Sequence, residues 1–225
     1  MRALYGGFLL FLLGSGALSC RTDKGSEKKI SDRQESILTK VAYAHGFEQW
    51  SKVQSIQFTF NVDRDTSHFE RRWLWWPKTN QVSTITGNDT LTYNRRQLDS
   101  TLHKTNAGFI NDKFWLLMPF QLLWDQENFT YQYFPKKMAP ISGDTLNKLT
   151  IVYDSIGGYT PGDAYDLYLD DTYSLREWTF RKGNRSQPSL NTTWEAYRET
   201  NGMKIATEHQ NLEGFRLYFT NLKID

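Results

Sequence analysis

The sequence predicts a mainly β fold of about ten or eleven antiparallel strands, with one N-terminal helix and one short apolar helix near the middle. Three observations predict it. Aromatic residues make up 15% of the chain, and such residues favour strands and bury large apolar areas. Apolar and polar residues alternate over many short segments, as they do on half-buried strands. Turn-forming residues separate those segments, so neighbouring strands are expected to pair as hairpins.

The N-terminal helix is predicted over residues 31–44. Ser31 can act as its N-cap, and Gln34 follows three residues later in the register of a capping box. Gly46 is expected to end the helix. The apolar residues between them fall at helical spacing: Ile37, Leu38, Val41 and Ala44.

The period of the pattern changes from about four to two after Trp50. The predicted strands cover residues 56–62, 69–76, 81–86, 90–95, 129–134, 149–154, 165–170, 175–181, 193–200, 204–210 and 215–224. The predicted turns lie at residues 87–89, 157–158, 170–171, 184 and 201–202. Asn201-Gly202 is the strongest hairpin signal among them, because this dipeptide suits a type I′ turn.

A very apolar segment, residues 111–120, interrupts the strands. Asn111 or Asp112 can cap a helix there, and Pro119 is expected to end it. The prediction is therefore one or two helical turns with an apolar face.

The beginning of the chain predicts a lipoprotein signal peptide over residues 1–19. Arg2 precedes an apolar run that is too short to span a bilayer comfortably, and small residues follow. Residues 17–20, Ala-Leu-Ser-Cys, resemble a bacterial lipobox, in which the cysteine receives a diacylglyceryl group. Cys20 is the only cysteine, so it cannot form an intramolecular disulfide, and acylation explains a lone thiol in a secreted protein. The alternative is an ordinary secretory signal that happens to stop beside a cysteine.

These features predict an acylated (palmitate-carrying) lipoprotein, anchored outside the cytoplasm and specifically at the bacterial outer membrane. Residues 20–30 are polar and charged, which is typical of a flexible tether. Residues 31–225 are predicted to form a single domain, because neither a linker nor a repeat divides them. The net charge of +2 comes from basic residues scattered among acids, a pattern that gives no reason to expect nucleic-acid binding.

No pattern for catalysis or metal binding stands out. His45, His68, His103 and His209 do not show the spacing of a zinc site, and we expect them to be surface residues. The acidic pair at residues 170–171 is expected to form a turn, and residues 165–170 a strand with one solvated face. No nucleophile elbow or phosphate-binding loop is present. We therefore predict no catalytic residue, no metal and no cofactor.

Clusters of apolar and aromatic residues are the strongest functional candidates. Residues 73–76, Trp-Leu-Trp-Trp, place bulky groups on both faces of one strand. Such a strand is either buried on both faces, as core packing requires, or one face lines a ligand cavity. The same two interpretations apply to residues 114–120 and to residues 178–180. The candidate ligand-binding residues are Phe58, Phe60, Trp73, Trp75, Trp115, Leu116, Met118, Phe120, Trp178 and Phe180.

The order of lipobox, tether, helix, strands and the segment Phe-Trp-Leu-Leu-Met-Pro-Phe at residues 114–120 resembles the LolA/LolB-like lipoprotein-carrier superfamily. The similarity is greatest to its lipid-anchored members from Bacteroidetes. It covers residues 31–225 and includes a later hairpin at residues 165–178. The resemblance implies an open, curved half-barrel with helices that plug its mouth and a concave apolar face that holds acyl chains. No arginine of this chain is matched to the one that latches the lid in that family.

The leading hypothesis is a membrane-anchored protein that binds a hydrophobic ligand, either a lipid or the acyl chains of a lipoprotein, in an apolar concave cavity. Its partners are then the membrane, through acylated Cys20, and that ligand. The anchor favours a receiver or a resident binder over a diffusing shuttle. The alternative is a structural or protein-interaction lipoprotein of the envelope. A structure in which residues 73–76 are exposed on a convex face would favour this alternative. An enzyme that acts on lipid or glycan is the third hypothesis.

Overall fold

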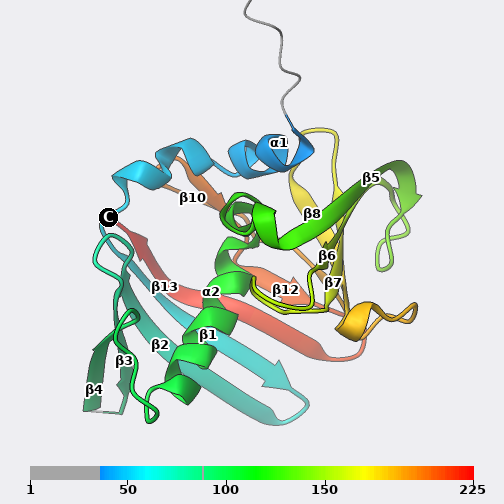
Figure 1. The fold of residues 1–225 in the computed structure, drawn as a ribbon. Helices are drawn as coiled ribbons and strands as arrows, with labels where there is room; N and C mark the ends of the chain where they lie inside the picture. The colour runs from blue at the N-terminus through cyan, green and yellow to red at the C-terminus, as the bar shows by residue number, and fades with distance from the viewer. Residues whose placement is uncertain (1–35, 88) are drawn as a thin grey trace, which may run out of the picture. The chain divides into compact units, whose positions relative to one another are not determined.

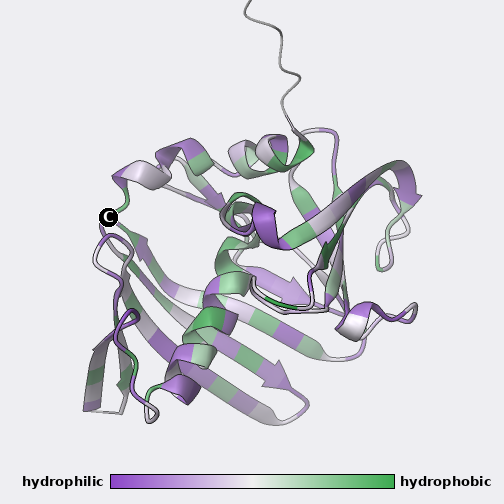
Figure 2. Ribbon diagram, in the orientation of Figure 1, coloured by the Kyte–Doolittle hydropathy of each residue, from purple (hydrophilic) through white to green (hydrophobic). Residues whose placement is uncertain are grey.

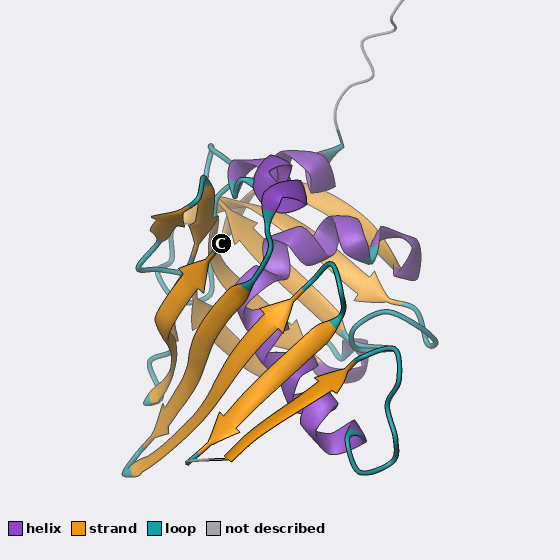
Figure 3. Ribbon diagram, turned by 90° about the vertical axis from the view of Figure 1, so that its left-hand side faces the viewer, coloured by secondary structure: helices purple, strands orange, loops and turns teal. Residues whose placement is uncertain are grey.

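Two antiparallel sheets curve around a long helix in the computed structural model, which describes residues 36–87 and 89–225 (Figure 1). The first sheet has the strand order β12-β13-β1-β2-β3-β4. Its strands are β1 (Ile56–Arg64), β2 (Ser67–Trp76), β3 (Gln81–Thr86), β4 (Asp89–Asn94), β12 (Glu208–Gln210) and β13 (Phe215–Ile224). When this sheet faces the viewer, the helix passes behind it (Figure 3).

The second sheet has the strand order β5-β6-β7-β8-β9. Its strands are β5 (Phe129–Met138), β6 (Thr145–Tyr153), β7 (Ala164–Leu169), β8 (Leu175–Arg181) and β9 (Leu190–Thr193). The two sheets meet where Glu195, just after β9, bridges Glu208 of β12. Their far edges, β4 and β5, remain separate in the described part of the chain. The predicted fold class, a mainly β, open and curved half-barrel, is therefore confirmed.

The predicted hairpin at Asn201-Gly202 is also confirmed. It joins β10 (Arg198–Thr200) to β11 (Met203–Ile205), which pair with each other apart from the two larger sheets. Asn201 has a φ of 49° and Gly202 a φ of 73°. Positive values at both central residues are what a type I′ turn requires.

The described residues contain thirteen strands, rather than the predicted number of about ten or eleven. The difference arises at residues 193–200 and 204–210, each of which was expected to form one strand and is divided in two. The backbone of Trp194 donates to Arg176 of the second sheet (2.7 Å), whereas Glu195 bridges to the first. Ala196 then has a φ of 50°. The chain passes from one sheet to the other here, and a single straight strand cannot pair with both.

The predicted solvated face of residues 165–170 is wrong, because every residue of β7 is buried. Tyr165 and Leu167 belong to the hydrophobic core. Asp166 points the other way, but long basic side chains of the neighbouring strands cover it. Arg181 Nε lies 3.1 Å and Lys148 Nζ 3.7 Å from its carboxylate. The predicted turn after β7 is correct, since Asp170 accepts from the backbone N–H groups of residues 172 and 174.

Helix α1 (Ile37–Ala44) begins later than the sequence pattern predicts. Its N-cap is Ser36, whose backbone is extended and whose hydroxyl accepts from the Thr39 N–H at 3.2 Å. The predicted cap Ser31 lies outside the described residues. Gly46 stops the helix as expected, with a φ of 82°, and the short 3₁₀ helix η1 (Phe47–Lys52) follows.

Helix α2 (His103–Trp124) is much longer than the predicted one or two turns. Asn111 and Asp112 lie inside it and do not cap it, and Pro119 does not end it. Instead Leu117 leaves helical geometry (φ −126°, ψ 26°), so that the helix kinks just before the proline. The kink places Pro119 in the first turn of a new helical segment, where its missing N–H has no intrahelical partner to lose. The short 3₁₀ helix η2 (Gln126–Asn128) connects α2 to β5.

The hydrophobic core lies between α2 and the concave faces of both sheets. Hydrophobic and hydrophilic residues alternate along the strands (Figure 2), and the residues of α2 from Asp112 to Leu122 are all buried. None of the described helices is both long and apolar enough to cross a membrane. The predicted signal peptide (residues 1–19), Cys20 and the tether (residues 20–30) lie outside the described residues.

Candidate functional site

A cavity of about 430 Å³ opens where one end of the half-barrel meets the middle of α2. Three neighbouring strands of the first sheet, β2, β1 and β13, form its wall, and α2 and β9 complete it. The lining residues are Phe60, Val62, Arg64, Ser67, Phe69, Arg71, Asn111, Trp115, Leu190, Phe215 and Leu217.

The wall of the cavity follows from the strand register. Side chains at alternate positions point to the same face of a sheet, and Val62 faces the concave side between its partners Phe69 on β2 and Leu217 on β13. These residues form an apolar strip across three strands. Phe69 is 48% exposed on this strip, although its ring faces the inside of the half-barrel. An exposed aromatic ring on a concave apolar wall is a surface that a ligand can cover.

An ion pair between β2 and α2 stands beside the cavity. Arg71 donates through Nε (2.7 Å) and one terminal nitrogen (2.5 Å) to the two oxygens of Asp112. The indole N–H of Trp73 donates to the same carboxylate at 2.8 Å, and the Asn111 amide at 3.0 Å. The guanidinium also lies over the ring of Phe69, 4.9 Å from its centre. The network connects the cavity wall to the helix that closes it.

Opposing effects act on the pKa of the Asp112 carboxyl. Burial raises the pKa of its carboxyl, while Arg71, Asn111 and Trp73 act in the opposite direction. The carboxylate is completely buried, whereas Arg71 is 32% exposed. Taking a carboxylate out of water is costly unless it is paired and hydrogen-bonded, so Asp112 depends on these three donors.

The structure brings only two of the predicted ligand-binding residues, Phe60 and Trp115, to the cavity. The others lie in the packed core or, for Phe180, at its edge. Trp75 packs on Trp50 and Phe120 on Phe47 near the opposite end of the half-barrel, with ring centres 5.5 and 5.4 Å apart. The remaining predicted residues fill the interior: Phe58, Trp73, Leu116, Met118 and Trp178.

Trp115 joins the cavity to an aromatic cluster behind it. Its ring centre lies 4.4 Å from that of Trp178, 5.4 Å from that of His209 and 6.3 Å from that of Phe215. Trp178 in turn packs on Trp194 at 5.3 Å. Core packing therefore accounts for most of the aromatic surplus of the sequence.

The expectation of surface histidines is wrong for two of the four. His45 and His209 are both buried. The ring of His45 contacts the carbonyl oxygen of Val41 at 2.8 Å, and that of His209 the carbonyl oxygen of Thr193 at 3.3 Å. Burial lowers the pKa of His45 to about 4 and that of His209 to about 3. No group of three possible metal ligands occurs among the described residues.

The buried His209 predicts a loss of stability in acid. Its pKa is lower in the folded protein, so the unfolded chain binds the proton more tightly. Its contribution is complete above pH 6.5 and is lost as the pH falls toward about 3. At about pH 5 the loss amounts to roughly 2 kcal/mol of the free energy of unfolding, relative to a pH above 6.5. Urea unfolding at several pH values should therefore show a flatter pH dependence for His209→Phe than for the original chain.

The matched control is His68→Gln. His68 is exposed, and its hydrogen bond to Asp63 raises its pKa, so its removal should not flatten the profile between pH 6.5 and 5. An unchanged slope in His209→Phe would show that the buried ring is protonated without penalty.

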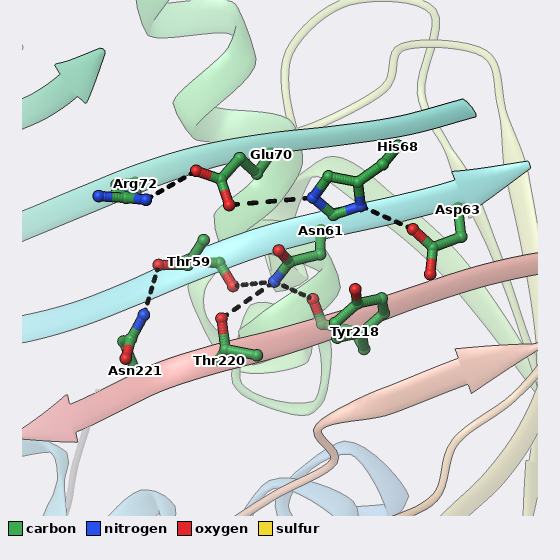
Figure 4. Close-up of polar contacts among 9 residues, drawn as sticks. All are labelled: Thr59, Asn61, Asp63, His68, Glu70, Arg72, Tyr218, Thr220 and Asn221. Carbon is green, nitrogen blue, oxygen red and sulfur yellow. Dashed lines mark hydrogen bonds and ion pairs between the residues drawn. The ribbon is translucent and has the colours of Figure 1, made fainter. Parts of the chain in front are cut away.

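The outer face of β1, β2 and β13 carries a group of polar contacts (Figure 4). The Asn61 amide donates to the carbonyl oxygens of Thr59 and Tyr218 (3.1 and 3.2 Å), and Asp63 bonds His68 at 2.7 Å. The face also carries Glu70, Arg72, Thr220 and Asn221. Trp73 and Trp75 do not lie on it, because they are buried on the concave side. The exposure that favours a protein-interaction role is therefore absent for these two tryptophans.

Sequence reasoning missed the two arginines that line the cavity, Arg64 and Arg71, and the partner of Arg71, Asp112. The sequence did contain a partial signal. Arg64 alternates with Phe60 and Val62 on one strand, and Arg71 alternates with Trp73 on the next, so both arginines fall on the core-facing side. Asp112 follows Asn111 in a segment that resembles a helix cap, so the local pattern offered no reason to expect a buried ion pair with Arg71.

Comparison with known proteins finds similarity in fold to solved structures of low sequence identity. No protein-family model matches the sequence, and no curated protein matches it. The chain is similar to a solved DUF1329 family protein from Desulfovibrio piger, at 13% identity and a TM-score of 0.47, over 84% of this chain and 93% of the other. It is also similar to a structure described as an outer membrane lipoprotein-sorting protein domain from Vibrio parahaemolyticus. There the identity is 11% and the TM-score 0.43, over 84% and 93% of the two chains.

Proposed function

We propose that this protein is a membrane-anchored lipoprotein outside the cytoplasm that binds a hydrophobic ligand, a lipid or an acyl chain, in the concave cavity of its half-barrel. Its role is then binding, in the handling of envelope lipids or lipoproteins, and not catalysis. The observation that carries the proposal is the apolar cavity of about 430 Å³ between the first sheet and α2.

The size and lining of the cavity support this role. Ligand sites commonly have volumes of about 300–1,000 Å³ and mostly apolar walls with a few polar groups. Here aromatic and aliphatic side chains make up most of the lining, and the polar groups are Arg64, Ser67, Arg71 and Asn111. Phe69 is 48% exposed, so a chain bound against its ring buries apolar area, which contributes about 25 cal/mol per Å².

The anchor is the second part of the proposal and rests on the sequence. Cys20 and the apolar segment before it support acylation and export. Assignment to the outer membrane and to the lipid-anchored Bacteroidetes group stays a prediction. Cys20→Ser should move the protein from the membrane fraction to the supernatant, and an unchanged distribution would reject acylation at this residue.

Photocrosslinking tests the ligand site on the full chain. The protein is placed in lipid nanodiscs and irradiated with a diazirine-labelled fatty acid, and the labelled peptides are identified by mass spectrometry. We expect label on the β1–β2 and β13 peptides that contain Phe60, Phe69 and Phe215, and competition by unlabelled fatty acid. Leu217→Trp, which fills the cavity, should reduce that label at least about tenfold, since one or two kcal/mol of lost contact is enough.

Ile85→Trp is the matched control, because Ile85 is an exposed apolar residue of the same sheet whose register places it on the outer face, opposite Arg72. It should leave the labelling pattern unchanged. Label that is spread over the surface, or that Leu217→Trp does not reduce, would contradict the proposed site.

A further inference from the structure

The cavity has an asymmetric charge. Two of its lining residues are arginines, and none of the lining residues is acidic. Arg64 at the end of β1 and Arg71 within β2 lie on opposite sides of the apolar row of Val62 and Phe69, because Arg64 pairs with Ser67 and Arg71 with Phe60. A neutral hydrocarbon does not require this arrangement.

Arg71 and Arg64 differ in what neutralises them. The guanidinium of Arg71 is occupied by the bidentate contact with Asp112. Arg64 makes no ion pair with any residue in the described part of the chain. Two acids flank Arg64 in the sequence: Asp63 points to the outer face, where it contacts His68 and Arg216, and Asp65 makes no ion pair with Arg64. Arg64 therefore supplies a positive charge without an ion-pair partner among the described residues, at the mouth of an apolar cavity.

The side chain of Arg64 is exposed and lies over an aromatic ring of the cavity wall. Its guanidinium carbon lies 5.3 Å from the centre of the Phe215 ring, a cation–π distance. The backbone oxygen of Arg64 accepts from the Ser67 hydroxyl at 2.8 Å, which closes the β1–β2 turn beneath it. Phe215 also lines the cavity, so the guanidinium of Arg64 lies directly beside the apolar wall.

The volume limits the number of acyl chains. Ligand sites commonly have volumes of about 300–1,000 Å³. The cavity of about 430 Å³ lies near the lower end of that range, which favours one acyl chain over the two or three chains of a diacyl or triacyl lipid.

We propose that the ligand is a single-chain amphiphile with an anionic head group, a carboxylate or a phosphate, whose chain lies on the wall formed by Phe60, Val62 and Leu217 and whose head group pairs with Arg64. This inference rests on the proposed binding function and narrows its ligand class. Arginine suits both head groups, because its planar donors bind carboxylate and phosphate oxygens. The apolar part supplies affinity, and the arginine selects the anion.

The same photocrosslinking assay tests the head group. Labelling by a diazirine fatty acid and by the fatty alcohol of equal chain length is measured on the full chain in neutral-lipid nanodiscs at about pH 8, where a carboxylic acid is ionised. The original chain should prefer the acid. Arg64→Gln should weaken labelling by the acid about tenfold and leave the alcohol unchanged. Arg64→Lys should keep most of the preference, and Arg72→Gln on the outer face should keep all of it.

Competitors identify the source of the anion and the chain number. Unlabelled fatty acid and lysophosphatidic acid distinguish a carboxylate from a phosphate. The compound that reduces labelling at the lower concentration identifies the preferred head group. Diacyl phosphatidic acid should compete much more weakly than the lyso form. Equal labelling by acid and alcohol in both the original chain and Arg64→Gln would overturn this inference while leaving the proposed binding function intact. No specific labelling by any probe would reject the binding function itself.

Discussion

Trp178→Ala is expected to lower the free energy of unfolding by about 4 kcal/mol, because truncation of a large buried aromatic side chain leaves a cavity that the surroundings only partly fill. Trp178 is 2% exposed and contacts aromatic rings from α2, β7 and the segment after β9. Its ring centre lies 4.4 Å from that of Trp115, 5.1 Å from that of Tyr165 and 5.3 Å from that of Trp194. Equilibrium urea unfolding followed by far-UV circular dichroism measures the change.

Trp178→Phe separates ring packing from the indole N–H. The Nε1 atom of Trp178 is buried without a hydrogen-bond partner among the described residues. Phenylalanine keeps a ring and removes that unpaired donor, so we expect a loss of roughly 1.5 kcal/mol. Trp76→Ala on the half-buried outer face should cost about 1 kcal/mol or less. Equal losses for Trp178→Ala and Trp76→Ala would contradict a central role for the aromatic cluster.

Asp112→Ala is expected to destabilise the protein by about 3 kcal/mol, near the lower limit for breaking a buried ion pair. The substitution leaves the Trp73 N–H without its acceptor and Arg71 without its counter-charge. Because Arg71 is 32% exposed, water can hydrate part of its guanidinium, which keeps the loss from being larger. Urea unfolding near pH 7 measures it, with tryptophan fluorescence as a second probe of Trp73.

Asp112→Asn and Asp63→Ala test the origin of this loss. Asparagine keeps one oxygen for the Trp73 N–H but no charge for Arg71, so its effect should lie between those of aspartate and alanine. Asp63 also contacts basic residues, but on the exposed outer face, and such pairs contribute little. If Asp112→Ala and Asp63→Ala were equally mild, the pair between β2 and α2 would not hold the helix against the sheet.

Local rules were sufficient for most of the strands. The bounds of β3, β8 and β13 match the predicted residues 81–86, 175–181 and 215–224. Alternation along a strand and the turn residues at its ends involve only a few neighbouring residues, so both can be identified from the sequence without knowledge of tertiary contacts. The Asn201-Gly202 hairpin is predictable for the same reason, since the backbone angles of two residues decide it.

The length of α2 depended on contacts that are distant in sequence. Locally, Pro119 is a helix terminator and Asp112 a helix cap. In the structure Asp112 is paired with Arg71, 41 residues earlier, and a kink at Leu117 accommodates the proline. Burial between two sheets stabilises a helix that local propensity would interrupt, because tertiary packing contributes more than propensity does.

The sequence alone determined the strand pattern, the antiparallel class and the presence of an aromatic interior in this protein, because each depends on the order and type of nearby residues. Only the tertiary structure decided which aromatic residues face a cavity. Phe60 and Trp115 line it, while Trp75 and Phe120 pack at the other end of the half-barrel. It also placed Arg64 beside Phe215, residues of two strands far apart in the chain. A cavity is formed where separate elements meet, and pairing between distant strands sets that meeting point.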